Sequence, residues 1–268
     1  MQIIRVKAIN APGRALGCEK APAEILRVLS DIASNEKGKL IDKKLFNLEE
    51  IHVNNSDVEE SQELIYKNAK KIFSEQDKAF FIGGDHSISY PLMKAFSEVF
   101  RNSFLIVFDA HVDCIAGGKG TSGKEPTHEE WLRKLVEEGF PPENIILISA
   151  RNIWPEEFVF IKEKKIRIIT MQQIQEDRRG VCDGIMEKAR GADGLYISID
   201  IDSIDPGFAP ATGYLEPGGM TSRELIYFLH RLTLLKSFKA ADIVEINPDK
   251  DINEMTIKLG AKLLAEMI

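Results

Sequence analysis

The stretch Ser103-Phe-Leu-Ile-Val-Phe-Asp-Ala-His-Val-Asp113 decides the fold. Its apolar run over 104–108 is typical of a strand that is buried on both faces of a parallel sheet. Side chains of a strand alternate between faces, so Asp109, His111 and Asp113 point the same way if the extended geometry continues. Open α/β sheets bind ligands at the carboxyl ends of their strands. Two carboxylates and an imidazole gathered there require a counter-charge, which a divalent cation supplies.

Two further apolar strands end in the same kind of pattern. Gly194-Leu-Tyr-Ile-Ser-Ile-Asp-Ile-Asp202 ends in two aspartates, and Ala79-Phe-Phe-Ile-Gly-Gly-Asp-His-Ser87 ends in two glycines followed by Asp and His. One acidic strand end is commonly solvated or caps the next helix. Three such ends with His and Asp interleaved favour a shared metal site instead. Asp85 is the exception, because a helix cap or a ligand-orienting role explains it better than metal binding.

Composition bounds the remaining classes of protein. The chain has 268 residues, of which 44% are hydrophobic and 29% charged, and its net charge is −7. These values predict one large domain over residues 1–268 and disfavour nucleic acid or a membrane surface as the partner. The three cysteines, Cys18, Cys114 and Cys182, form no CxxC motif and are typical of reduced thiols. With no signal peptide recognisable at the start, we expect a cytoplasmic protein.

Strands and helices are expected to alternate along the whole chain. Roughly eight strands, each followed by a helix, predict an α/β protein with a three-layer α/β/α sandwich and a mostly parallel sheet. Two loops interrupt the alternation: the Gly-rich residues 114–127 and the Pro- and Gly-rich residues 205–219. The sequence predicts helices over 178–190 and from about residue 252 to the end, and a capping box between Thr221 and Glu224.

The motifs resemble those of a known family. Gly83-Gly-Asp-His-Ser87, Asp109-Ala-His-Val-Asp113 and Ser198-Ile-Asp-Ile-Asp-Ser-Ile-Asp-Pro206 resemble the three signature motifs of the ureohydrolases, the arginase/agmatinase family. Similarity extends through 209–223 and 245–248. The resemblance implies an eight-stranded three-layer fold, two Mn²⁺ ions per subunit, and metal-dependent hydrolysis of a small guanidino substrate, a linear amidine, to an amine and urea. It also implies a homo-oligomer, a trimer or hexamer.

The resemblance also implies roles for individual residues. One manganese would be held by His86, Asp109, Asp113 and Asp200, and the other by His111, Asp109, Asp200 and Asp202. Glu245 would pair with the guanidinium, and His128 would relay a proton to the leaving amine. Asp202, together with the metals, would steady the tetrahedral intermediate.

Two of these roles have alternatives. The family usually has a small residue after the histidine at 128, whereas Glu129 stands here, and His128 could instead begin a helix after Thr127. Glu245 could be a structural ion-pair partner inside its apolar strand. Cys114 follows Asp113 where hydroxyl residues are commoner in the family, so the substrate's far end cannot be inferred from the loop after it.

The substrate therefore remains open among several guanidino compounds. Agmatine, giving putrescine and urea, is favoured because the stretch 216–224 resembles agmatinases and the arginases' Asn-x-His-Gly pattern is missing. Arginine is second, and formimidoylglutamate or another guanidino acid third. A single-zinc deacetylase is disfavoured by the two full ligand sets. A catalytically silent metal-binding member of the family is the alternative from another class of protein.

Overall fold

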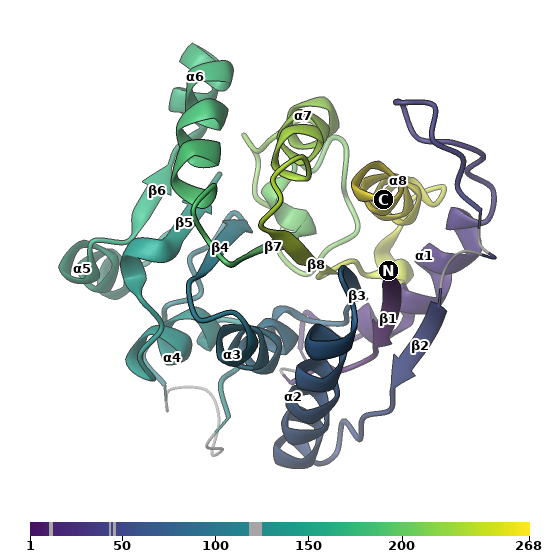
Figure 1. The fold of residues 1–268 in the computed structure, drawn as a ribbon, viewed down its shortest axis with the longest axis horizontal. Coiled ribbons are helices and arrows are strands. Elements are labelled where there is room, and N and C mark those ends of the chain that lie inside the picture. Colours follow the sequence, from purple (N-terminus) through teal and green to yellow (C-terminus); the bar gives the residue numbers. More distant parts are fainter. Residues whose placement is uncertain (11–12, 43, 45–46, 118–124) are drawn as a thin grey trace.

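The computed structural model describes residues 1–10, 13–42, 44, 47–117 and 125–268. In this part of the chain eight strands form one sheet in the order β2-β1-β3-β8-β7-β4-β5-β6, and all neighbouring strands pair in parallel (Figure 1). The predicted eight-stranded sheet is thus confirmed. Residues 118–124 of the predicted Gly-rich loop lie outside the described residues. The strands are β1 (Gln2–Val6), β2 (Asn47–Ile51), β3 (Ala79–Ile82), β4 (Ser103–Phe108), β5 (Ile145–Ile148), β6 (Arg167–Ile169), β7 (Gly194–Asp200) and β8 (Phe238–Val244).

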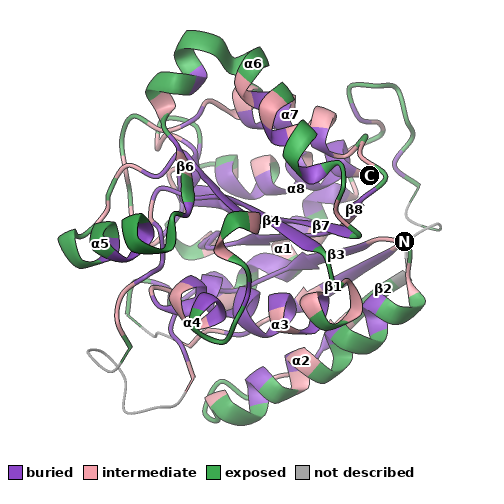
Figure 2. Cartoon of the chain, turned by 60° about the vertical axis from the view of Figure 1, so that its left-hand side comes forward, coloured by how far each residue is buried: buried purple, intermediate pink, exposed green. Residues whose placement is uncertain are grey.

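Helices cover both faces of the sheet, which confirms the three-layer architecture (Figures 1 and 2). One layer contains α2 (Val58–Glu75), α3 (Ser89–Val99), α4 (Trp131–Glu137) and α5 (Pro155–Lys164). The other contains α1 (Ala21–Leu29), α6 (Met171–Ala189), α7 (Ser222–Leu232) and α8 (Met255–Met267).

The central strands are buried because both of their faces carry apolar side chains. In β4, Phe104, Ile106 and Phe108 pack into the core beneath α1, α6, α7 and α8. Leu105 and Val107, which alternate with them, pack into the core on the opposite face. Each large side chain buried in this way contributes about 1.5–3 kcal/mol through the hydrophobic effect. The sequence prediction of a strand buried on both sides is therefore confirmed.

Two predicted helices differ from the structure at their starts. The helix predicted over 178–190 begins earlier, at Met171, because Thr170 and Gln173 form a capping box that the sequence analysis missed. Its backbone leaves helical geometry at Asp177, close to the predicted start. The last helix begins at Met255 rather than near 252, since Asn253 and Glu254 have positive φ values of 52° and 60°.

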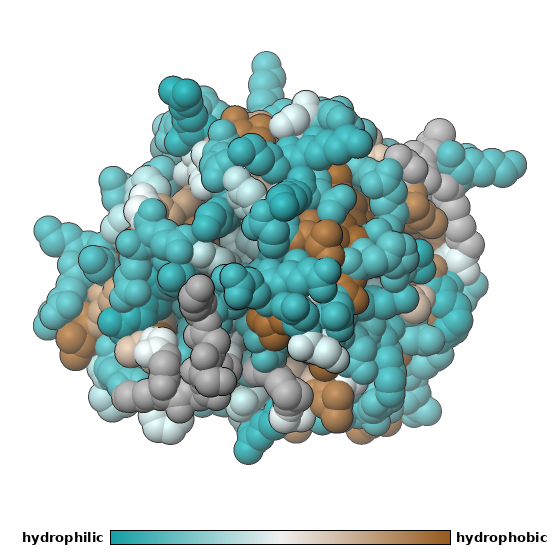
Figure 3. Space-filling model, turned by 90° about the horizontal axis from the view of Figure 1, so that it is seen from below, coloured by the Kyte–Doolittle hydropathy of each residue, from teal (hydrophilic) through white to brown (hydrophobic). Residues whose placement is uncertain are grey.

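The strand order brings distant parts of the sequence together at the carboxyl-terminal ends of the parallel strands. β3 and β4 follow one another in the chain, yet β8 and β7 lie between them in the sheet. The four adjacent strands β3, β8, β7 and β4 are the ones that precede the residues of the predicted site. Among the described residues no helix is long and apolar enough to span a membrane. The face in Figure 3 is mostly hydrophilic, with hydrophobic residues in small separate patches.

Candidate metal centre and active site

The first histidine of the site follows a close approach of two backbone segments. A Cβ atom on Gly84 would lie 2.0 Å from the carbonyl oxygen of Ala8, so only glycine fits there. The chain then enters a short 3-10 helix, His86–Ile88, which Asp85 caps by accepting a hydrogen bond from the amide of Ser87. The interpretation of Asp85 as a cap is confirmed.

His86 points its Nδ1 atom into a group of three carboxylates. This nitrogen lies 2.9 Å from Asp113 Oδ2, 3.2 Å from Asp109 Oδ2 and 3.3 Å from Asp200 Oδ2. Burial lowers the pKa of His86, but the attraction of the three carboxylates around Nδ1 outweighs it and raises the pKa well above its usual value.

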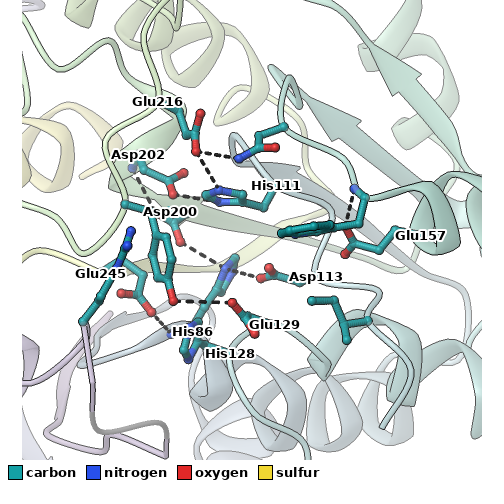
Figure 4. A pocket seen from close by; sticks show the side chains of 15 residues that line it. His86, His111, Asp113, His128, Glu129, Glu157, Asp200, Asp202, Glu216 and Glu245 are labelled. Atoms are coloured by element: carbon teal, nitrogen blue, oxygen red, sulfur yellow. Dashed lines mark hydrogen bonds and ion pairs between the residues drawn. The ribbon is translucent and has the colours of Figure 1, made fainter. Parts of the chain in front are cut away.

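His111 stands beside this group and shares one of its aspartates. Its Nδ1 atom lies 3.0 Å from Asp202 Oδ2 and 3.5 Å from Asp109 Oδ1. On the other side of the ring, Nε2 lies 3.4 Å from Glu216 Oε1. Asp109 therefore belongs to two clusters of ligand atoms, one with His86 and Asp200 and one with His111 and Asp202. Figure 4 shows these two histidines together with Asp200 and Asp202.

Local backbone geometry and hydrogen bonds hold the aspartates in place. Asp113 has a φ of 48°, a left-handed conformation that is uncommon for residues other than glycine. Its Oδ2 atom accepts a hydrogen bond of 2.7 Å from the indole Nε1 of Trp131, at the start of α4. Asp200 and Asp202 accept bonds from the backbone amides of Asp202 and Ala110, respectively. Each carboxylate is thus oriented before any ligand arrives.

The donor set fits divalent cations. Asp109, Asp113, Asp200 and Asp202 are each no more than 7% exposed, and unpaired buried charges of one sign are costly. His86 Nδ1 makes no hydrogen bond of good geometry with any described residue, although three carboxylates surround it. Carboxylate and imidazole donors without thiolate suit hard or borderline ions such as Mn²⁺. Asp109 lies where it can belong to both sites, as the resemblance implied.

Glu245 enters the site from the end of β8. Its backbone has a φ of 63°, and its amide donates to the carbonyl of Gly84. The side chain is 3% exposed, and Oε1 accepts a hydrogen bond of 2.8 Å from the backbone amide of His86. Burial raises the pKa of Glu245 to about 7. No Lys or Arg among the described residues forms an ion pair with it, so nothing supports the structural ion-pair alternative.

His128 lies in the segment before α4 and lines the same cavity. The alternative that His128 begins a helix after Thr127 is wrong, because α4 begins at Trp131 and Glu130 accepts a bond from the amide of Thr127. Both ring nitrogens of His128 are buried and have no hydrogen-bond partner among the described residues. Burial lowers the pKa of His128, but the negative charge of Glu245 and its neighbours outweighs it and the pKa is raised.

A buried polar network supports His86 from behind. Its Nε2 atom lies 2.9 Å from Ser198 Oγ, and Ser198 donates to Asp242 Oδ1 at 2.7 Å. Asp242 also accepts hydrogen bonds from Ser89 and Tyr196. A fixed partner on the second nitrogen sets the tautomer and the orientation of a metal-ligating imidazole.

These residues open into a cavity of about 350 Å³. Sequence analysis had named its inner part but not its outer lining, which includes Arg14, Trp154, Glu157, Tyr214 and Glu216. The sequence contains some signals for this lining. Trp-Pro-x-Glu at 154–157 is typical of a helix start, and the prolines and glycines of residues 205–219 indicate a loop. Arg151 donates to the carbonyls of Asp202 and Glu216 and so ties this loop to the segment that carries Asp202.

The fold and site define a class of protein, a metal-dependent hydrolase of the three-layer α/β/α type. A profile described as the Arginase family matches residues 9–268, and the chain belongs to that family. It is 32% identical to an arginase of Staphylococcus aureus, over 87% of this chain and 83% of the relative. It is 29% identical to an agmatinase of Bacillus subtilis, over 85% of this chain and 76% of the relative.

Structural comparison gives the same fold. The proclavaminate amidino hydrolase of Streptomyces clavuligerus superposes with a TM-score of 0.89 at 24% identity, over 99% of this chain and 89% of that one. Across the first curated relatives the matched region spans from 58% to 83% of their length. The predicted family is confirmed, and so is the prediction of a metal-dependent hydrolase of linear amidines. The roles of individual residues stay predictions.

Proposed function

We propose that the protein is a manganese-dependent ureohydrolase that acts on a guanidino amine, with agmatine as the preferred substrate and putrescine and urea as products. The observation that supports this proposal best is the position of the Glu245 side chain. Its Oε1 atom is held by the amide of His86, and its Oε2 atom has only a weak contact of 3.9 Å with the thiol of Cys18, so Oε2 can still accept from a cation beside the two clusters that share Asp109. A guanidinium N–H that donates to this carboxylate makes a charge-assisted hydrogen bond, which is stronger than one between neutral groups.

His86, Asp109, Asp113 and Asp200 would hold one ion, and His111, Asp109, Asp200 and Asp202 the other. When bound, such ions supply Lewis acidity, which lowers the pKa of water and provides a nucleophile at neutral pH. Glu245 binds the guanidinium and turns its carbon toward the clusters. Asp202 accepts from the amide of Ala110 through Oδ1, which fixes the carboxylate beside the reacting carbon. His128, whose ring nitrogens have no partner among the described residues, holds the proton for the leaving amine.

The charge of the cavity supports a substrate with a second positive charge. Glu129, Glu157, Glu216 and Glu245 line it in addition to the predicted metal ligands, whereas Arg14 is the one lysine or arginine among its described lining residues. Arginine is the second candidate, because the chain is 32% identical to an arginase. Three buried thiols support a reducing, cytoplasmic compartment.

Urea release from agmatine, arginine and 4-guanidinobutyrate by the Mn²⁺-loaded protein tests the proposal. Formamide release from formimidoylglutamate is measured beside it, because that compound yields no urea. We expect the highest kcat/KM with agmatine. Preference for arginine would refute the substrate, and bound metal without turnover of any compound would indicate the catalytically silent alternative.

A further inference from the structure

The outer rim of the cavity is assembled around one buried carboxylate. Glu157 Oε2 accepts a hydrogen bond of 3.0 Å from the backbone amide of Trp154, and Oε1 accepts one of 2.9 Å from the amide of Cys114. Glu157 is only 2% exposed, so these two bonds are shielded from water. They hold Trp154, at the start of α5, against the segment that carries Ile115.

A second acid continues the rim on the other side of Ile115. The amide of Ile115 donates to the backbone carbonyl of Glu129 at 3.0 Å. The Glu129 carboxylate in turn accepts a hydrogen bond of 3.4 Å from the hydroxyl of Tyr214. Trp154, Ile115, Glu129 and Tyr214 come from separate segments, yet all four line the cavity in this linked order. In Figure 4, Glu129 lies below the histidine and aspartate cluster and Glu157 to its right.

The chemistry of this rim is suited to an amphipathic cation. Trp154 and Ile115 offer apolar surface for methylene groups, and Trp154 is 58% exposed, so a ligand can cover it. Tyr214 already binds one cation, because the guanidinium carbon of Arg14 lies 4.9 Å from its ring centre. Glu129 adds a formal negative charge next to that ring. A carboxylate in the same place would face the negative charge of Glu129.

We propose that Trp154, Ile115, Glu129 and Tyr214 form the subsite for the far end of the substrate, and that this end is a primary ammonium on a short methylene chain. The inference rests on the proposed function and adds the residues that select the substrate. Trp154 and Ile115 contact the chain, and Glu129 binds the ammonium. An α-amino acid head places its carboxylate against Glu129 and is disfavoured.

Two substrates that differ only in the terminal amine test the role of Glu129. Agmatine carries an ammonium on its butyl chain, and butylguanidine has a methyl group in its place. Glu129→Gln should lower kcat/KM for agmatine about tenfold, the effect of one charge-assisted hydrogen bond, and leave butylguanidine within about twofold. Glu143→Gln is the matched control, because Glu143 is exposed beside the amino end of β5, at the opposite edge of the sheet. It should change neither substrate.

Trp154→Ala separates chain contact from charge recognition. It should lower kcat/KM for agmatine and butylguanidine by similar factors, about tenfold, because both chains lose the same apolar contact. Equal losses for both substrates in Glu129→Gln would overturn the proposal. So would a preference for 4-guanidinobutyrate that disappears in Arg14→Met, since the far end would then be a carboxylate bound by Arg14.

Calorimetric binding of the amine products keeps this test independent of turnover, because neither product can be hydrolysed. The Mn²⁺-loaded protein and Glu129→Gln are titrated with putrescine, the amine from agmatine, and with butylamine, the amine from butylguanidine. The subsite predicts that wild-type protein binds putrescine more tightly and that the variant loses most of this difference. If no compound releases urea, the proposed function fails. Equal binding of putrescine by both proteins would refute the subsite.

Discussion

Replacing Glu245 with glutamine tests the centre of the proposed mechanism. The change keeps the size of the side chain and removes one charge. Oε1 accepts from the amide of His86, so the amide oxygen of glutamine takes that place and its NH₂ group faces the cavity. The guanidinium then meets a donor where it had an acceptor.

The expected loss can be worked from these contacts. A hydrogen bond to a charged group contributes about 1.5–3 kcal/mol, and facing two donors costs roughly 1 kcal/mol more. The sum, about 2.5–4 kcal/mol, corresponds to roughly a 60- to 700-fold lower kcat/KM at about 1.4 kcal/mol per tenfold. Part of the loss should be a higher KM, since the guanidinium is charged in the substrate as well as in the transition state.

Steady-state urea release and thermal unfolding of the same preparations separate function from folding. Glu245→Gln should keep the wild-type Tm, because a neutral amide costs less to bury than a carboxylate. Glu266→Gln is the control, because it is expected to lower stability and leave activity unchanged. Glu266 is a buried acid of α8 that pairs with His230 at 2.5 Å and does not line the cavity, so it should lose stability and keep kcat/KM. A wild-type kcat/KM in Glu245→Gln would refute the assignment.

Three further outcomes follow from the same structure. Metal analysis after Mn²⁺ loading should find about two ions per chain, and Asp109→Asn, at the residue shared by both clusters, should lower both occupancies; a variant that keeps two ions would contradict the sharing. His128→Asn should lower kcat by roughly 10²–10⁴-fold with little change in KM, whereas a normal kcat would mean that another group carries the proton. The third prediction concerns the pKa of Glu266. Burial raises this pKa, but the hydrogen bonds with Lys262 and His230 lower it by more, so the net shift is downward. Because the pKa of Glu266 is lower in the folded than in the unfolded protein, the ionised side chain stabilises the fold at pH values above the unfolded-state pKa. This stabilisation is lost as the pH falls through the folded-state pKa. Denaturant unfolding at pH 7 should show Glu266→Gln about 1.5–3 kcal/mol less stable, and near pH 4 the gap should narrow; a constant gap would refute the ionic origin.

The strands and the inner site could be predicted because the sequence carries their signals locally. An apolar run buried on both faces of a sheet needs no distant information, and β4 and β7 lie where the sequence predicted them. Asp109, His111 and Asp200 follow those strands directly, so parallel pairing is enough to bring them together. The helix ends were predicted less closely. The start of α6 at Met171 depends on a cap at Thr170, a contact between side chain and backbone that periodicity does not detect.

The rim could not be predicted in the same way, because its residues meet through loops. Trp154 and Ile115 are nearly forty positions apart in sequence, and the carboxylate of Glu157 brings them together through two backbone amides. Neither hydrophobic period nor motif spacing encodes that contact. Tyr214, whose hydroxyl donates to Glu129, belongs to the loop 205–219, and Arg151 holds that loop through the carbonyl of Glu216.

The predicted metal ligands and the rim of the cavity should differ in how well they tolerate substitution. The predicted metal ligands are set by strand ends in the core, where a shift of one residue would turn every side chain to the other face. The rim depends on single side chains in loops over a fixed floor, and loops tolerate substitution more readily than buried strands. Substitutions at Trp154 or Glu129 should therefore alter the choice of substrate without unfolding the chain, whereas substitutions at Asp109 should impair every substrate alike. If the proposed subsite is right, chemistry and specificity are carried by different elements, which is consistent with relatives in this family that have names as different as arginase and agmatinase.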